Sequence, residues 1–242
     1  MMFRKQIIQF LQVPFKGFRG ILSLFYPQCC CVCNKKLIEE EQYICLDCLL
    51  KMPKTNYHFQ AENSAADRFN GKFPYERVAA FLYYNKGGWA QKVVVNIKYK
   101  GNVDLGCYMG EFMAKKIQQS SFFDDIDLIV PIPLHRKKLK QRGFNQAEKI
   151  AQGIEKATGI TVADLVTRKK QNQTQTKKGR YARWLNAMDI FVTEKKEDFN
   201  YNHILIVDDV LTTGATVEAC AQSILQSYPD LKISVLTLAV TE

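Results

Sequence analysis

Hydrophobic positions along the chain form two kinds of run. Four short apolar segments predict β-strands, and three of them are nearly continuous, as in strands buried on both faces. These segments are residues 77–84, 125–133, 203–209 and 232–240. Between them, longer stretches with more widely spaced apolar positions predict helices. These stretches are residues 89–101, 104–120, 142–159 and 216–228. Strands alternating with helices predict an α/β fold, with a parallel sheet flanked by helices.

Polar stretches divide the chain into three predicted parts. We expect an amphipathic segment over 1–26, a small cysteine-rich module over 27–54, and the α/β domain over 75–242. Residues 54–74 are poor in aliphatic side chains and suggest a linker or extended loop. A helix within the first segment can pack on its own protein, lie on a membrane or bind a partner.

The charge balance favours anionic partners. The formal net charge is +10 at pH 7, which suits nucleotides, phosphorylated sugars, nucleic acid or an anionic membrane, without choosing among them. No apolar run is long enough to span a bilayer, and the N-terminus lacks the uninterrupted apolar core and cleavage site of a signal peptide. We therefore expect a cytoplasmic protein.

Six of the eight cysteines lie within the short module, and four of these form two C-x-x-C pairs. The paired residues are Cys30, Cys33, Cys45 and Cys48. Two such pairs can place four thiolates around one point, which suits a structural Zn²⁺ in a reducing compartment. A set that includes Cys29 stays open, and two disulfides are the alternative. Four thiolates leave no free coordination position, so we expect the metal to hold the module together and not to catalyse.

The most informative stretch, HILIVDDVLTTGATV, runs from His203 to Val217. Ligands of open α/β sheets bind beyond the carboxyl ends of the strands, and Asp208 and Asp209 lie at such an end. Their carboxylates can accept hydrogen bonds from the vicinal hydroxyls of a ribose, and can lie near Mg²⁺. The following loop leads into a helix N-terminus, where free amides bind anions. That loop consists of Thr212, Thr213, Gly214, Ala215 and Thr216.

Two further basic segments can supply charge to the same ligand. One follows the strand at 125–133 and carries His135, Arg136, Lys137 and Arg142. A phosphate site needs donors from more than one strand end, although a charge run of this kind is also typical of a solvated helix face.

The second basic segment covers residues 168–186 and has seven Lys or Arg residues and no acid. Its candidate residues are Arg168, Gln175 and Arg183. We expect a flexible loop that closes over a polyanionic substrate or contacts a nucleic-acid backbone.

The segment from Ile204 to Thr216 resembles the phosphoribosyl pyrophosphate signature of type I phosphoribosyltransferases. The resemblance implies that fold, with Asp208 and Asp209 holding the ribose hydroxyls and residues 212–216 holding the 5-phosphate, and Mg²⁺ bound with the substrate. Purine-salvage members usually carry an aspartate where this chain has Thr212, so salvage of hypoxanthine or guanine is disfavoured. The acceptor is left open.

The whole arrangement resembles the ComF family of competence proteins. The similarity rests on IKYKG (97–101), on the RGFNQ block (142–146), on the pattern from Arg168 to Phe191 and on the four-cysteine module; Asn172 departs from the family's usual threonine. The resemblance implies a role in DNA uptake during natural transformation, with or without phosphoribosyl transfer. Implied partners are single-stranded DNA and competence helicase-type proteins. The alternative is a non-catalytic module that senses phosphoribosyl pyrophosphate or binds single-stranded DNA.

Overall fold

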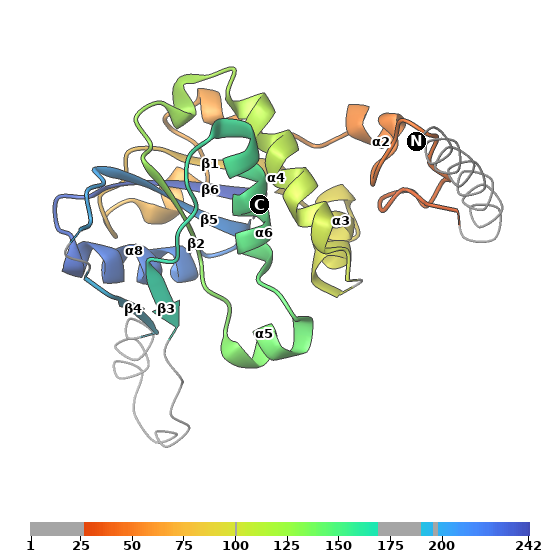
Figure 1. Cartoon of the computed structure of the whole chain (residues 1–242). Coiled ribbons are helices and arrows are strands. Elements are labelled where there is room, and N and C mark those ends of the chain that lie inside the picture. The colour runs from red at the N-terminus through yellow and green to blue at the C-terminus, as the bar shows by residue number, and fades with distance from the viewer. Residues whose placement is uncertain (1–26, 100, 169–189, 196–197) are drawn as a thin grey trace, which may run out of the picture. The chain divides into compact units, whose positions relative to one another are not determined.

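The computed structural model (Figure 1) describes the chain in four stretches. They are residues 27–99, 101–168, 190–195 and 198–242. The chain divides into two compact units, and the division falls between Met52 and Pro53. The predicted N-terminal amphipathic segment, residues 1–26, lies outside the described residues.

The described part of the first unit, residues 27–52, contains the cysteine pairs and the short helix α2 (Leu46–Leu50). An isolated bridge pairs Cys29 with Lys36, and Ile44 is almost fully buried. This core is small, so packing alone gives the unit little stability.

The second unit is built on a parallel sheet of four strands in the order β1-β6-β5-β2. The strands are β1 (Val78–Tyr84), β2 (Leu128–Pro131), β5 (His203–Leu211) and β6 (Lys232–Thr241). All four residues of β2 and eight of the ten residues of β6 are buried, as expected for a sheet covered on both faces. The predicted α/β fold is confirmed.

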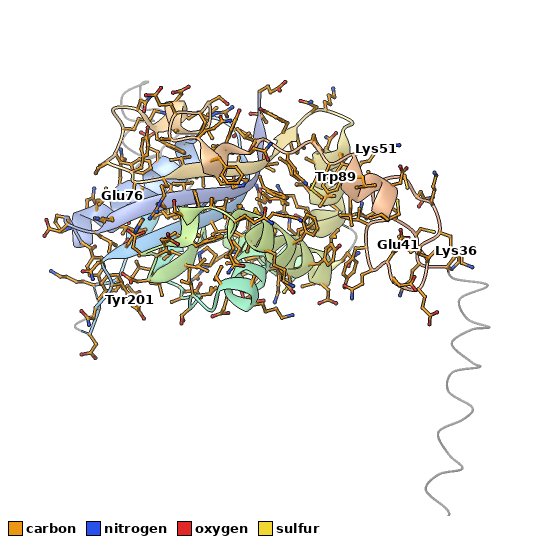
Figure 2. The ribbon with its side chains drawn as sticks, turned by 90° about the horizontal axis from the view of Figure 1, so that it is seen from above. Lys36, Glu41, Lys51, Glu76, Trp89 and Tyr201 are labelled. Carbon is orange, nitrogen blue, oxygen red and sulfur yellow. The ribbon has the colours of Figure 1, made fainter. Side chains whose placement is uncertain are left out.

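Helices cover both faces of this sheet (Figure 1). The covering helices are α3 (Trp89–Tyr99), α4 (Val103–Ile117), α6 (Gln146–Thr158) and α8 (Ala215–Ser227), whereas α5 (Arg136–Arg142) has no buried residue. The pair α4 and α6 packs on one face and α8 on the other, and side chains fill the space between the layers (Figure 2). Gly110 and Gly153 allow α4 and α6 to approach closely, because a Cβ at either position would lie 2.0 Å from a carbonyl oxygen of the facing helix.

A second, antiparallel sheet pairs β3 (Val166–Arg168) with β4 (Phe191–Thr193). The hydroxyl groups of Thr193 and Ser223 lie 3.0 Å apart, which ties this small sheet to α8. Residues 169–189, which connect its two strands, lie outside the described residues.

Two local features differ from the sequence predictions. Residues 54–74, suggested as a linker or extended loop, pack within the second unit as the short 3₁₀ helices η1 (Tyr57–Phe59) and η2 (Ala66–Phe69). A third, η3 (Ser121–Phe123), precedes β2. The helix predicted from Arg142 begins only at Gln146, because Gly143 adopts a left-handed conformation and ends α5.

Within the described stretches, none of the helices has the length and apolar character needed to cross a bilayer.

Candidate functional site

The acid pair lies near the carboxyl end of β5, which continues to Leu211. Side chains alternate along a strand, so the two carboxylates leave the strand on opposite faces. Asp209 is buried, whereas Asp208 is partly exposed. The Asp209 amide donates a hydrogen bond to Asp208 Oδ1 at 2.8 Å. Lys98, in the last turn of α3, places its Nζ 2.7 Å from Asp209 Oδ2.

The environment of Asp208 favours its protonated form. Burial, together with the neighbouring Asp209 charge, raises the pKa of Asp208 to about 7, although the Asp209 amide and the charges of Lys98 and Arg168 act in the opposite direction. Any ligand that supplies positive charge or hydroxyl donors would stabilise the ionised form of a carboxylate with such a pKa. The acid pair is therefore a candidate site for such a ligand.

The loop after β5 turns sharply into α8. Gly214 has φ +82° and serves as the N-cap of that helix, and the first intrahelical bond runs from the Glu218 amide to the Gly214 carbonyl at 2.9 Å. The amide groups of the first helical turn have no partner within the helix, which makes a helix N-terminus suitable for an anion, although the Ala215 amide donates to Thr213 Oγ1 at 3.4 Å. Thr212, Thr213 and Thr216 are exposed around this N-terminus.

A segment distant in sequence supports this loop. A Cβ at Gly214 would lie 2.8 Å from a ring carbon of Phe69, which is fully buried. The neighbouring Arg68 reaches the Leu211 carbonyl at 3.4 Å and the Thr241 hydroxyl at 3.3 Å, and it also contacts the Thr241 carbonyl. The segment expected to be a linker therefore holds the loop in place.

The basic segment after β2 forms α5, whose residues are mostly exposed. His135 is its N-cap and accepts a hydrogen bond from the Lys137 amide at Nδ1, at 3.2 Å. Asn145 is the N-cap of α6 and also donates to the Ile132 carbonyl at 3.0 Å, which fixes the return of the segment to the sheet. His135 and Asn145 therefore have structural roles, and Arg136 and Lys137 are exposed.

Arg142 connects this segment to α3. Its guanidinium donates to Gln146 Oε1 at 2.9 Å and lies over the Tyr99 ring, 5.2 Å from the ring centroid. The Tyr99 hydroxyl lies 3.5 Å from the same group. The IKYKG and RGFNQ motifs therefore meet through one stacked pair.

Of the flexible-loop candidates, the structure describes only Arg168. It packs over the Phe191 ring at 5.4 Å, and its Nε is buried without a hydrogen-bond partner among the described residues. Burial lowers the pKa of Arg168, and the charge of Asp208 opposes this effect. Gln175 and Arg183, like Asn172, lie outside the described residues.

The first unit brings Cys30, Cys33, Cys45 and Cys48 together, with their sulfur atoms all within 4.8 Å of one another. Cys33 Sγ and Cys45 Sγ are 3.6 Å apart, close to the spacing of about 3.8 Å that a tetrahedral site with Zn–S bonds of about 2.3 Å requires. The predicted set of four is confirmed as a cluster that can bind a metal such as zinc. Cys29 is exposed and outside it.

Three residues of the site could not be found from the sequence. Lys98 is 111 positions from Asp209, Phe69 is 145 positions from Gly214, and Arg68 is 143 positions from Leu211. Lys98 and Tyr99 belong to the IKYKG motif. Their partners, Asp209 and Arg142, are known only once the fold has brought α3 close to β5 and α5.

Comparison with known proteins agrees with this geometry. A model of the phosphoribosyl transferase domain matches residues 109–240, more than half of the chain. The chain belongs to this phosphoribosyl transferase domain family. The match includes β2, the basic segment, the acid pair and the loop before α8.

Individual relatives are named as competence proteins or DNA utilization proteins. The chain is 27% identical over 158 residues to the competence protein ComFC of Bacillus subtilis, covering 64% of this chain and 61% of that protein. It is 33% identical over 139 residues to the DNA utilization protein YhgH of Salmonella typhimurium, covering 56% and 60%. The matches therefore span about three fifths of the length of these relatives. The predicted resemblance to the ComF family is confirmed.

Among solved structures, the chain is similar to one described as the allosteric regulatory enzyme of purine biosynthesis. The identity is 14% and the TM-score 0.38, with 60% of this chain and 30% of the other covered.

Proposed function

We propose that the second unit of this phosphoribosyl transferase domain protein binds phosphoribosyl pyrophosphate. The observation that carries the proposal is the loop that joins an adjacent acid pair, of which Asp209 is buried, to a helix N-terminus. Asp208 and Asp209 would accept hydrogen bonds from the ribose hydroxyls, and the amides and hydroxyls of residues 212–216 would bind the 5-phosphate.

The pyrophosphate end of this ligand would meet the basic segment. Arg136 and Lys137 are exposed on α5, and Arg142 is fixed by Gln146 and Tyr99. If transfer occurs, the C1–pyrophosphate bond breaks as an acceptor nucleophile bonds to C1. The cations of this segment would stabilise the charge that develops on the leaving pyrophosphate, and the acid pair would stabilise the positive ribose.

The residues also fit a magnesium ion. Mg²⁺ prefers oxygen ligands and is usually held by one or two carboxylates together with substrate phosphates, as Asp208 and Asp209 can provide. When bound, the ion would add positive charge at the pyrophosphate and make it a better leaving group.

The test is a thermal-unfolding titration with phosphoribosyl pyrophosphate and Mg²⁺. For the wild-type protein we expect the midpoint to rise by about 5 °C at a hundredfold excess over Kd. Replacing both Asp208 and Asp209 by Asn should abolish the rise, and the exposed-site control Asp230→Asn should retain it. An equal rise in the double variant would exclude the proposed ribose contact.

For the first unit we propose a bound structural Zn²⁺. The four thiols supply the full ligand set of a closed tetrahedral site, so the ion would stabilise the fold and take no part in chemistry.

A second candidate function, binding of single-stranded DNA, is supported by the exposed basic surface of α5. Arg136, Lys137, Lys138 and Lys140 are exposed there, and α5 has no acidic residue. The names of the relatives, competence protein and DNA utilization protein, favour a role in DNA uptake. Retention of an oligonucleotide that weakens steeply with salt would support this function, and salt-independent retention or none would exclude it.

A further inference from the structure

The ion pair between Lys98 and Asp209 lies inside the candidate site. Its atoms are 2.7 Å apart, and the two side chains are only 20% and 8% exposed. Lys98 lies in the last turn of α3, the helix that follows β1, so the ion pair connects α3 to β5. The strands β1 and β5 are not neighbours in the sheet.

The charges at this point are unequal. The carboxylates of Asp208 and Asp209 are adjacent. Of these two, only Asp209 forms an ion pair with a described residue, the ammonium group of Lys98. Lys98 therefore neutralises one of two acids, and the other is left with a raised pKa by burial and the neighbouring charge. An ion pair of this kind adds little to stability, because desolvation of both groups offsets their attraction.

The position of the ammonium group is the important point. Lys98 Nζ lies 2.7 Å from Asp209 Oδ2, an oxygen that a ribose hydroxyl or a divalent cation would need and that accepts no hydrogen bond among the described residues. A lysine has a flexible stem and a compact charge, so it can withdraw without moving α3.

We propose that Lys98 is a placeholder cation. Its ammonium group lies against the Asp209 carboxylate while the site is empty, and it competes with the divalent cation and the sugar for this carboxylate. The proposal rests on the proposed function, because it assumes that Asp209 belongs to the ligand site.

The test measures binding of Mn²⁺ alone, without any sugar, by electron paramagnetic resonance of the free ion at pH 8. Removal of the competing charge in Lys98→Met should tighten Mn²⁺ binding by about tenfold over the wild-type protein. Lys98→Arg, which keeps the positive charge, should bind as the wild-type protein does. The control Lys92→Met removes an exposed charge from the same helix and should change little. Equal affinity in Lys98→Met and wild type, or equal tightening in Lys92→Met, would overturn the proposal.

A second measurement uses the unaltered protein, in case Lys98→Met does not fold. Saturating Mn²⁺ should release the ammonium group, so acetylation of Lys98 by acetic anhydride, followed by mass spectrometry, should rise at least about twofold. Reactivity of Lys92 should stay constant. Unchanged or reduced labelling of Lys98 would contradict the placeholder role.

The two proposals can fail separately. A wild-type protein that binds phosphoribosyl pyrophosphate while Lys98→Met shows no change in Mn²⁺ affinity would remove only the role of Lys98. If the folded wild-type protein does not bind phosphoribosyl pyrophosphate, the proposed function is wrong, whatever the Mn²⁺ titration shows.

Discussion

Asp208 and Asp209 differ although they are neighbours in one strand. Asp209 is buried and paired with Lys98, whereas Asp208 is partly exposed and has no ion-pair partner among the described residues. The sequence predicted that both carboxylates lie at a strand end, but it gave no sign of this asymmetry, because the asymmetry depends on which face of β5 meets α3.

Asp208→Asn should increase the stability of the unliganded protein at neutral pH. The folded state raises the pKa of Asp208 from 3.8 to about 7, so the folded protein holds this proton more tightly than the unfolded chain does. The contribution of Asp208 to the free energy of unfolding therefore falls as pH rises from about 4 to about 7. We expect a gain of about 1–2 kcal/mol at pH 8 for the variant.

Chemical denaturation at pH 4.5 and pH 8 measures this effect. The difference between Asp208→Asn and wild type should be large at pH 8 and small at pH 4.5. A variant that is less stable than wild type at pH 8 would show that the carboxylate is well solvated in the folded protein.

At the scale of elements, the hydrophobic pattern was enough to place the four strands of the main sheet and most helices, but it did not predict β3 and β4. Continuous apolar runs predicted β2, β5 and β6, because both faces of this sheet are covered. The pattern did not predict the break before α6, where Gly143 ends one helix and Asn145 caps the next. It also missed the packing of residues 54–74, because Phe69 finds its buried place only against a loop far along the chain.

Gly214→Ala should damage the loop before α8 more than a typical glycine substitution. An alanine at φ +82° is strained, and its Cβ would lie 2.8 Å from the buried Phe69 ring. We expect a loss of about 2–3 kcal/mol in the free energy of unfolding, measured by denaturant titration, together with weaker sugar binding.

Gly159→Ala is the matched control for this prediction. Gly159 has φ +77° but no atom within 4 Å of its Cβ position, so only the backbone strain remains, worth about 1 kcal/mol. Equal losses in the two variants would contradict the supporting role of Phe69.

At the scale of the whole molecule, the two units owe their stability to different sources. The second unit has a large buried core around its sheet, whereas the described part of the first has few buried apolar side chains beside its four-cysteine cluster. The spacing of the cysteine pairs made this cluster predictable, because a C-x-x-C pair is a local structure that needs no distant partner.

Removal of the metal should therefore unfold the first unit and spare the second. A strong chelator should release about one Zn²⁺ per chain and make the segment from Pro27 to Met52 sensitive to protease, because such modules depend on their metal for folding. The Cys45→Ser variant should show the same sensitivity without a chelator. A first unit that resists protease after complete metal removal would contradict the proposed role of zinc.

The central claim is that the loop after β5 binds a phosphorylated ribose through its acids and its helix N-terminus. The most direct measurement is isothermal titration calorimetry of the wild-type protein with phosphoribosyl pyrophosphate, in the presence and absence of Mg²⁺. The account predicts saturable heat with one site per chain, and much weaker binding without the metal ion. Absence of saturable heat in a folded, metal-loaded protein would contradict it.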